Sequence, residues 1–84
     1  STEIEMQIEQ VFINLSHVLN EAGSSLSEIL KLNVYLTNLE NFSKVNEHME
    51  KIFKKPYPAR AAIGIKELPK GALIEIDAIA AEKK

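Results

Sequence analysis

The sequence has no cysteine, no tryptophan, only three glycines and three prolines, and no excess of basic residues. Without cysteine the chain can form neither a disulfide framework nor a thiolate metal site, so the usual supports of very small domains are excluded. Ten basic against twelve acidic residues give a formal charge of -2, which argues against a nucleic-acid binder with a broad basic surface. The fold must therefore be held by apolar packing or by association with another chain.

Long apolar runs and a basic N-terminal segment are also missing, and the first residues include Glu3 and Glu5. We therefore expect no membrane-spanning helix and no signal or transit peptide. The expected location is the cytoplasm, with the mitochondrial matrix as the alternative. The chain does have 84 residues, of which 45% are hydrophobic, enough for one small domain and too many for a disordered segment. We interpret residues 1–84 as a single domain.

The first part of the chain has the three- and four-residue spacing of apolar side chains that is typical of an amphipathic helix. This spacing predicts a helix over 2–22. Thr2 and Glu5 are placed as in a capping box, and Gly23 stands where a C-cap glycine is expected. Both ends of this helix are therefore marked by residue type.

The pattern then changes from a helical to a strand period. Apolar residues alternate strictly with polar ones from Leu30 to Thr37, which predicts a strand with one buried face. A second helix is predicted from about Asn41 to Lys54, with Asn38 or Asn41 as its N-cap.

Two β-type runs close the chain, Ala59–Glu67 and Ala72–Ala81, joined by Leu68-Pro69-Lys70-Gly71. Because proline suits the second position of a turn and glycine the last, this link predicts a hairpin. The order helix, strand, helix, strand, strand defines an α+β domain. Its strand–helix–strand portion should be a right-handed crossover between parallel strands.

The predicted hairpin, with Leu68 opposite Gly71, has one wholly apolar face that the helices should cover. The opposite face then collects small and ionisable residues, namely Arg60, Ala62, Gly64, Lys66, Glu75, Asp77 and Ile79. One interpretation is a solvated surface whose charge pairs contribute little. The other is a ligand hollow over Ala62, where Arg60 binds a carboxylate with its forked guanidinium and Glu75 moves a proton.

Other chemistry finds little support in the sequence. His17 and His48 are the only imidazoles and fall on different predicted helices, whereas a zinc site needs three or four clustered donors, so we predict no metal site. Ser24-Ser25 has no base placed near it, and serines are common in linkers.

Several motifs, in order along the chain, resemble the RidA/YjgF family of reactive-intermediate enamine/imine deaminases. They are Tyr57-Pro58-Ala59-Arg60, Leu68-Pro69-Lys70-Gly71-Ala72, Ile74-Glu75-Ile76 and Ala78-Ile79-Ala80, with upstream agreement at Asn14-Leu15, Ala22-Gly23, Val34-Tyr35-Leu36, Asn41-Phe42 and Val45-Asn46. The resemblance covers essentially the whole chain, and the correctly spaced Pro-Ala-Arg and Leu-Pro elements make it specific.

The resemblance implies a chorismate-mutase-like α+β subunit of the bacillary type, a layer of helices on a mixed sheet, packed as a homotrimer with a ligand cleft at each subunit interface. The implied activity is hydrolysis of 2-imino or 2-enamino acids, such as 2-aminoacrylate, to 2-oxo acids and ammonia, without a metal or an organic cofactor. Carried over by position, Arg60 binds the substrate carboxylate and Glu75 positions or protonates through water. The backbone at Ala62 contributes a hydrogen bond, and Asn46 supports the site from the second helix.

Family members also carry a strand pair before the first helix, with a Gly-Pro-Tyr-Ser and a Ser-Gly-Gln element that this sequence does not contain. We therefore expect residues 1–84 to correspond to the later, larger part of the family's domain and to leave a sheet edge open. A non-catalytic trimeric binding or chaperone-like module stays open as an alternative function. So does a translation inhibitor or ribonuclease, which the charge balance supports poorly.

Overall fold

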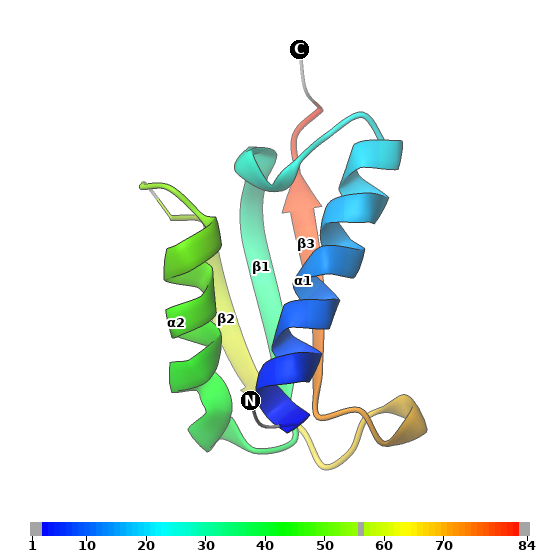
Figure 1. Ribbon diagram of the computed structural model, residues 1–84, viewed down its shortest axis with the longest axis vertical. Coiled ribbons are helices and arrows are strands. Elements are labelled where there is room, and N and C mark those ends of the chain that lie inside the picture. The colour runs from blue at the N-terminus through cyan, green and yellow to red at the C-terminus, as the bar shows by residue number, and fades with distance from the viewer. Residues whose placement is uncertain (1–2, 56, 83–84) are drawn as a thin grey trace.

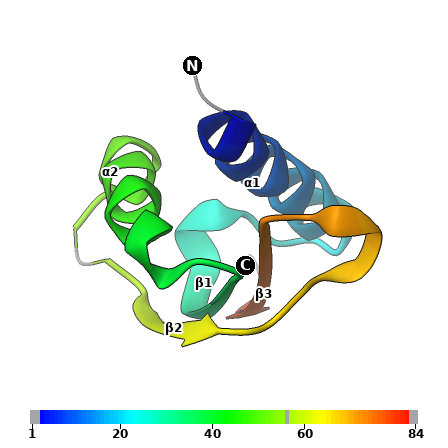
Figure 2. The same cartoon turned by 90° about the horizontal axis from the view of Figure 1, so that it is seen from below.

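The computed structural model describes residues 3–55 and 57–82, which follow the order α-β-α-β-β (Figure 1). The elements are α1 (Glu3–Glu21), β1 (Ile29–Leu36), α2 (Phe42–Ile52), β2 (Ala59–Gly64) and β3 (Ile74–Ala80), linked by 3-10 turns at Leu26–Glu28, Leu39–Asn41 and Pro69–Gly71. Both helices lie on the same face of the sheet (Figure 2). The predicted layer of two helices on a mixed sheet is confirmed.

Helix α1 ends where the sequence predicts. Gly23 has a φ of 78°, its N–H donates to the Asn20 carbonyl oxygen (3.2 Å), and the N–H of Ser24 donates to the Leu19 carbonyl oxygen (2.8 Å). These two bonds form a Schellman motif, which satisfies carbonyls at a helix C-terminus and favours glycine because its backbone tolerates positive φ. The predicted capping residue Thr2 lies outside the described residues.

Strand β1 differs from the prediction in the phase of its first residues. The later apolar residues of the strand are buried as expected, but Leu30 is 61% exposed and Ile29 is buried in its place. The pairing of β1 with β3 is irregular between Ile29 and Lys31, and such a bulge shifts the alternation of inside and outside residues by one. The prediction that Leu30 faces the core is therefore wrong.

Helix α2 ends earlier than predicted because the backbone is extended at Phe53, and a 3-10 turn precedes its first residue. Asn38 provides the cap of this turn, since its side-chain oxygen accepts a hydrogen bond from the N–H of Glu40 (3.0 Å). The other candidate, Asn41, makes no side-chain cap. The capped turn sets the start of α2 and places Phe42 at its first position.

The sheet has the strand order β2-β1-β3, with β1 parallel to β2, as the predicted crossover requires, and antiparallel to β3. The predicted hairpin between the last two strands is wrong, because β1 lies between them and residues 65–73 cross its end (Figure 2). The N–H of Ile65 donates to the Leu36 carbonyl oxygen (2.9 Å), and the N–H of Thr37 donates to the Leu73 carbonyl oxygen (3.3 Å). Neighbouring strands are about 4.8 Å apart. The connection 65–73 is long enough to pass the end of β1 and join the strands on either side of it, whereas a tight turn can join only adjacent strands.

The observed register also changes which residues share a face. Arg60 pairs with the buried Leu32 on the helix side, whereas Glu75 pairs with Tyr35 on the open side. Ala62, two residues after Arg60, also faces the helix side. The prediction that Arg60 and Glu75 share one face is therefore wrong, because it rested on direct pairing of β2 with β3.

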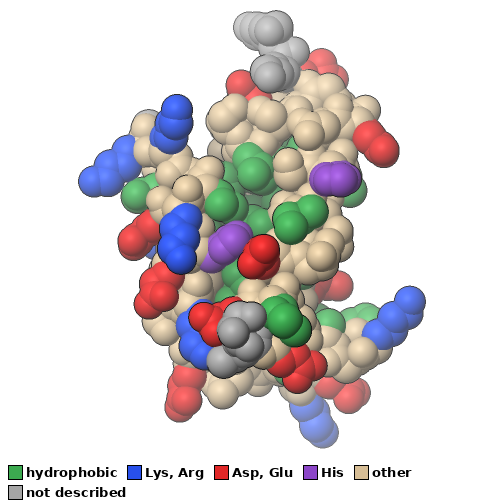
Figure 3. Space-filling view, viewed as in Figure 1, with side chains coloured by type: hydrophobic (Ala, Val, Ile, Leu, Met, Phe, Trp, Pro, Cys, Tyr) green, Lys and Arg blue, Asp and Glu red, His purple; other side chains and the backbone are tan. Residues whose placement is uncertain are grey.

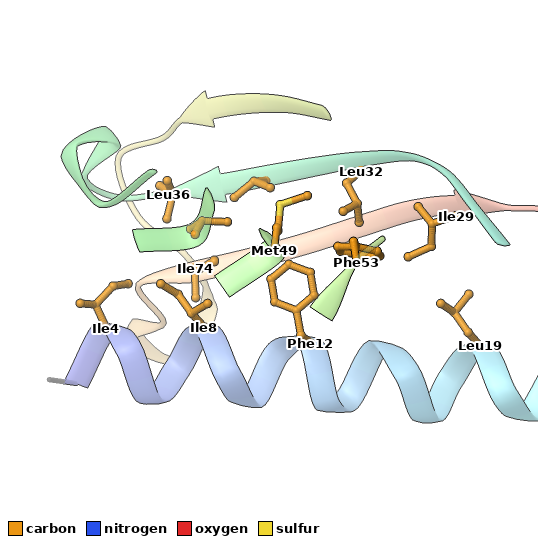
Figure 4. Close-up of a cluster of buried hydrophobic side chains, with 12 residues drawn as sticks. Ile4, Ile8, Phe12, Leu19, Ile29, Leu32, Leu36, Met49, Phe53 and Ile74 are labelled. Carbon is orange, nitrogen blue, oxygen red and sulfur yellow. The ribbon is translucent and has the colours of Figure 1, made fainter. Parts of the chain in front are cut away.

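The hydrophobic core fills the space between the helices and the sheet (Figure 4). Its buried members are Ile4, Ile8, Phe12, Leu19, Ile29, Leu32, Val34, Leu36, Val45, Met49, Phe53 and Ile74. The Phe12 and Phe53 rings meet edge to face at the centre, with 6.2 Å between centroids. Within residues 3–55 and 57–82, neither helix is long and apolar enough to cross a membrane.

Candidate functional site

Arg60 is the second residue of β2, an edge strand most of whose residues are exposed. Its guanidinium carbon lies 6.0 Å from the centre of the Phe42 ring, which is within the range of a cation–π contact. Among residues 3–55 and 57–82, the Arg60 side chain forms no ion pair and no hydrogen bond. Its N–H groups are therefore free to bind an external anion.

Asn46 lies one helical turn beyond Phe42 on α2, so the two side chains share a face of the helix. Its side-chain oxygen Oδ1 is buried and accepts no hydrogen bond from any described residue. A buried acceptor without a donor costs on the order of 1–3 kcal/mol. The helix side of the sheet thus holds Arg60, Ala62 and Asn46. The Arg60 guanidinium is a free hydrogen-bond donor there, and Asn46 Oδ1 is an unpaired acceptor.

The open face carries a polar cluster that the sequence analysis missed. The Asp77 carboxylate accepts hydrogen bonds from Asn33 Nδ2 (2.8 Å) and from the Tyr35 hydroxyl (2.9 Å), and Glu75 lies opposite Tyr35 in the neighbouring strand. The hydrogen bond to Asp77, then desolvation, then the charges of Asp77 and Glu75 raise the pKa of Tyr35, so its hydroxyl stays protonated at neutral pH. The cluster thus places two carboxylates beside a neutral phenol.

The sheet separates the predicted site residues into two groups. Arg60, Ala62 and Asn46 lie on the helix side, and Glu75 lies on the open side. A cavity of about 410 Å³ between α1 and β3 includes Glu75 in its wall but not Arg60. One copy of the chain therefore does not bring Arg60 and Glu75 into a common cleft.

The signal for the missed residues was present but incomplete. Asn33 and Tyr35 alternate with buried residues of β1, which predicts that they face away from the core. Their contact with Asp77 depends on β1 lying directly beside β3, which the hairpin interpretation did not predict. The contact of Phe42 with Arg60 depends in the same way on how α2 packs against β2.

A hollow follows the seam between the helices, where hydrophobic side chains line the groove and charges of both signs surround it (Figure 3). The His48 ring lies there, 5.3 Å from the Phe12 ring. Desolvation lowers the pKa of His48, the nearby Glu9 opposes this effect, and Lys51 adds to it. In the part of the chain that the structure describes, no group of three or more His, Cys, Asp and Glu residues could hold a metal ion.

Three comparisons with known proteins extend these observations. A 2-iminobutanoate/2-iminopropanoate deaminase of Dermatophagoides farinae is 36% identical over 76 residues, which is 90% of this chain and 59% of that protein. Protein MMF1, mitochondrial, of Saccharomyces cerevisiae is 40% identical over 80 residues, 95% of this chain and 55% of that protein. The crystal structure of RidA from the Antarctic bacterium Psychrobacter sp. PAMC 21119 matches with a TM-score of 0.87 and 43% identity, over 90% of this chain and 62% of that one.

Two helices on one face of a mixed sheet, with a free arginine on an edge strand, define a small α+β subunit of the chorismate-mutase-like type. The model of the family described as Endoribonuclease L-PSP matches residues 1–82. The chain belongs to this family, the RidA/YjgF family, as its motifs predicted. It spans less than two thirds of the length of each of the three relatives.

Proposed function

We propose that this chain is the subunit of an imine/enamine deaminase, which hydrolyses reactive 2-imino and 2-enamino acids to 2-oxo acids and ammonia. The observation that carries the proposal is the guanidinium of Arg60, which has no anionic partner in the described part of the chain. A guanidinium suits a planar carboxylate because it donates two parallel hydrogen bonds. The relative named 2-iminobutanoate/2-iminopropanoate deaminase supports the same class of substrate.

The proposed site forms between copies of the chain. Arg60 and Glu75 lie on opposite faces of one sheet, so a cleft that uses both takes Arg60 from one copy and Glu75 from the next. The homotrimer implied by the family resemblance offers such interfaces, because a closed ring joins two different surfaces at every contact. In this assembly the open face and the edge strand β2 are interface surfaces.

In the proposed site Arg60 binds the carboxylate of the substrate, and Glu75 holds the attacking water and transfers its proton. Water adds to the imine carbon, the C–N bond of the resulting carbinolamine breaks, and ammonia leaves the 2-oxo acid. The backbone of Ala62 donates or accepts a hydrogen bond beside Arg60, and Asn46 supports the site from α2. Because an imine carbon is already electrophilic, positioning and proton transfer suffice, and the reaction requires no metal or organic cofactor.

The test is the release of ammonia and 2-oxobutanoate from 2-iminobutanoate that a threonine dehydratase generates in the assay. Arg60→Ala should lower the rate at least about tenfold, because it removes a charge-assisted contact. Arg60→Lys should also lower it, since an ammonium cannot form the two parallel bonds. Lys66→Ala, which removes an exposed cation from the connection that follows β2, is the matched control. An Arg60→Ala rate equal to that of the wild type would overturn the proposal.

A non-catalytic binding module is the second candidate function. The separation of Arg60 and Glu75 within one copy favours it. It predicts that 2-oxobutanoate binds in an Arg60-dependent way without any turnover of the imine. Ribonuclease activity or translation inhibition, of which the family description names the first, predicts instead an RNA affinity that falls steeply with salt.

We propose a cytoplasmic location, with the mitochondrial matrix as the alternative. The yeast relative named as a mitochondrial protein supports the second compartment. Fractionation of cells that express the natural full-length protein distinguishes the two.

A further inference from the structure

The described residues do little to hold the Arg60 side chain in place. It is exposed on an edge strand, and the aliphatic part of its side chain has several rotatable bonds whose freedom is lost when a ligand orders it. The contact with the Phe42 ring, at 6.0 Å, is the one interaction that the described residues give this guanidinium. Within one copy, Phe42 is therefore the described residue best placed to orient Arg60 before a ligand arrives.

Phe42 itself is held firmly by the fold. It packs against the buried core cluster, and it is the first residue of α2. The turn before it is fixed by Asn38, whose side-chain oxygen accepts from the N–H of Glu40 (3.0 Å) and whose carbonyl oxygen accepts from the N–H of Asn41 (3.0 Å). The ring therefore presents a fixed surface, against which a mobile guanidinium can rest.

A close contact between the 3-10 turn before α2 and strand β2 sets the distance between Phe42 and Arg60. Leu39, in the 3-10 turn before Phe42, lies so near Gly64 that a Cβ atom on this glycine would stand 3.0 Å from the Leu39 side chain. Gly64 follows Arg60 on the same side of β2, so the absence of its side chain lets the start of α2 approach the strand.

We propose that Phe42 is the residue that positions Arg60, holding the guanidinium over its ring so that the N–H edge is oriented for a ligand carboxylate. A guanidinium that stacks on a ring uses its face, and its N–H groups remain free in the plane for the two parallel bonds to a carboxylate. The ring thus acts before binding and only through Arg60. This inference rests on the proposed function of Arg60 as the carboxylate-binding group.

The test compares Phe42→Leu and Phe42→Tyr with the wild type in imine hydrolysis and in equilibrium binding of 2-oxobutanoate. Phe42→Leu should raise KM and the Kd of 2-oxobutanoate about two- to fivefold, the range of an exposed cation–π contact, and should leave kcat nearly unchanged. Phe42→Tyr keeps an aromatic face and should restore both constants. Phe12→Leu, the same change at a buried ring on α1, should lower the thermal midpoint without changing the Kd.

A double-mutant cycle separates positioning from a structural role. If Phe42 acts only through Arg60, Phe42→Leu should have no further effect on the Kd in an Arg60→Ala background. A loss of affinity of equal size in both backgrounds would overturn the inference while leaving the proposed function intact. An Arg60→Ala variant that binds 2-oxobutanoate as tightly as the wild type would overturn the proposed function itself.

Discussion

The two faces of the sheet differ in the residues they carry and in how deeply those residues are buried. On the helix side, alternate residues of β1 and β3 are apolar and buried against α1 and α2. On the open side, Asn33, Tyr35 and Asp77 form hydrogen bonds among exposed or half-exposed groups, and Ile79 is 60% exposed beside them. The first face stabilises the single chain, whereas the second resembles an interface core of mixed polarity that a monomer does not need.

The same difference bears on the proposed site, which uses residues from both sides of the sheet. The helix side supplies the packing, and Arg60 stands at its margin on the exposed strand β2. The open side supplies Glu75 and its neighbours without any apolar cover among the described residues. In the proposed assembly, contact between the open face of one copy and strand β2 of the next would bury exposed apolar groups and bring together the two predicted catalytic side chains.

The prediction with the largest expected effect tests whether Arg60 of one copy and Glu75 of the next act together across an interface. Arg60→Ala and Glu75→Ala subunits should each be nearly inactive alone, but unfolding and refolding them together in equal amounts should restore activity. Random mixing in a ring leaves about a quarter of the interfaces with both wild-type side chains, so about a quarter of the wild-type rate should return. Imine hydrolysis after co-refolding is the measurement. If the mixture stays as inactive as its components, the two residues do not act across an interface.

The second prediction contrasts burial on the two faces with one kind of truncation. Met49→Ala on α2 removes a fully buried side chain and should lower the free energy of unfolding by about 2–5 kcal/mol. Ile79→Ala on the open face should cost less than about 1 kcal/mol in dilute solution, because the side chain is 60% exposed in a single copy. Urea unfolding measures both.

The dependence on protein concentration should distinguish Ile79→Ala from Met49→Ala further. If the open face is an interface, the cost of Ile79→Ala should grow with protein concentration, whereas that of Met49→Ala should not depend on whether the copies associate through Ile79. If the cost of Ile79→Ala is the same at all protein concentrations, Ile79 lies outside any interface.

The comparison also shows which parts of the fold depend on neighbours along the chain. The periodicity of α1 and the glycine at its end predicted the helix and its C-terminal cap, because both arise within a few residues. The apolar face predicted for the last two strands is confirmed only in part. Ile74, Ile76 and Ala78 of β3 face the helices, whereas Ala61 and Ile63 of β2 lie on the open face beside Asn33 and Tyr35. Local period identifies the alternating sets of residues, but pairing with neighbouring strands decides which set faces the core.

Strand order could not be read in this way. A Pro-Lys-Gly link suits a hairpin turn, yet Lys70 and Gly71 adopt positive φ values of 59° and 69° in a 3-10 turn within a longer connection. Whether β1 inserts between its two successors depends on which strands bury most when paired, a long-range property. The site residues were therefore identified by motif, and their relative placement was missed because it depended on strand order.

A third prediction concerns the unpaired acceptor on the helix side. Asn46→Leu removes a buried oxygen that has no donor among the described residues and should raise the free energy of unfolding by about 1 kcal/mol. If Asn46 supports the ligand site, the same variant should weaken 2-oxobutanoate binding. Asn14→Leu, at an exposed asparagine on α1, is the control and should change stability by less than about 0.5 kcal/mol. Destabilisation by Asn46→Leu would show that the oxygen has a partner in the assembled protein.

The smallest effect is a pH dependence from the seam between the helices. Desolvation against Phe12 lowers the pKa of His48 in the folded chain below its unfolded value, so the unfolded chain binds a proton more readily as the pH falls through 6.5. Stability should therefore decrease from pH 7 to pH 5 more in the wild type than in His48→Gln. Because the His48 side chain is only partly buried, solvent screening keeps this difference small.

The measurement is the difference in urea midpoint between wild type and His48→Gln at each pH, which cancels the titration of the carboxylates common to both. Glu9 and Lys51 act on His48 in opposite directions, so Glu9→Gln should enlarge the pH dependence by removing the charge that favours the imidazolium. A wild-type midpoint that rises relative to His48→Gln on acidification would mean that the Glu9 charge outweighs desolvation at this seam.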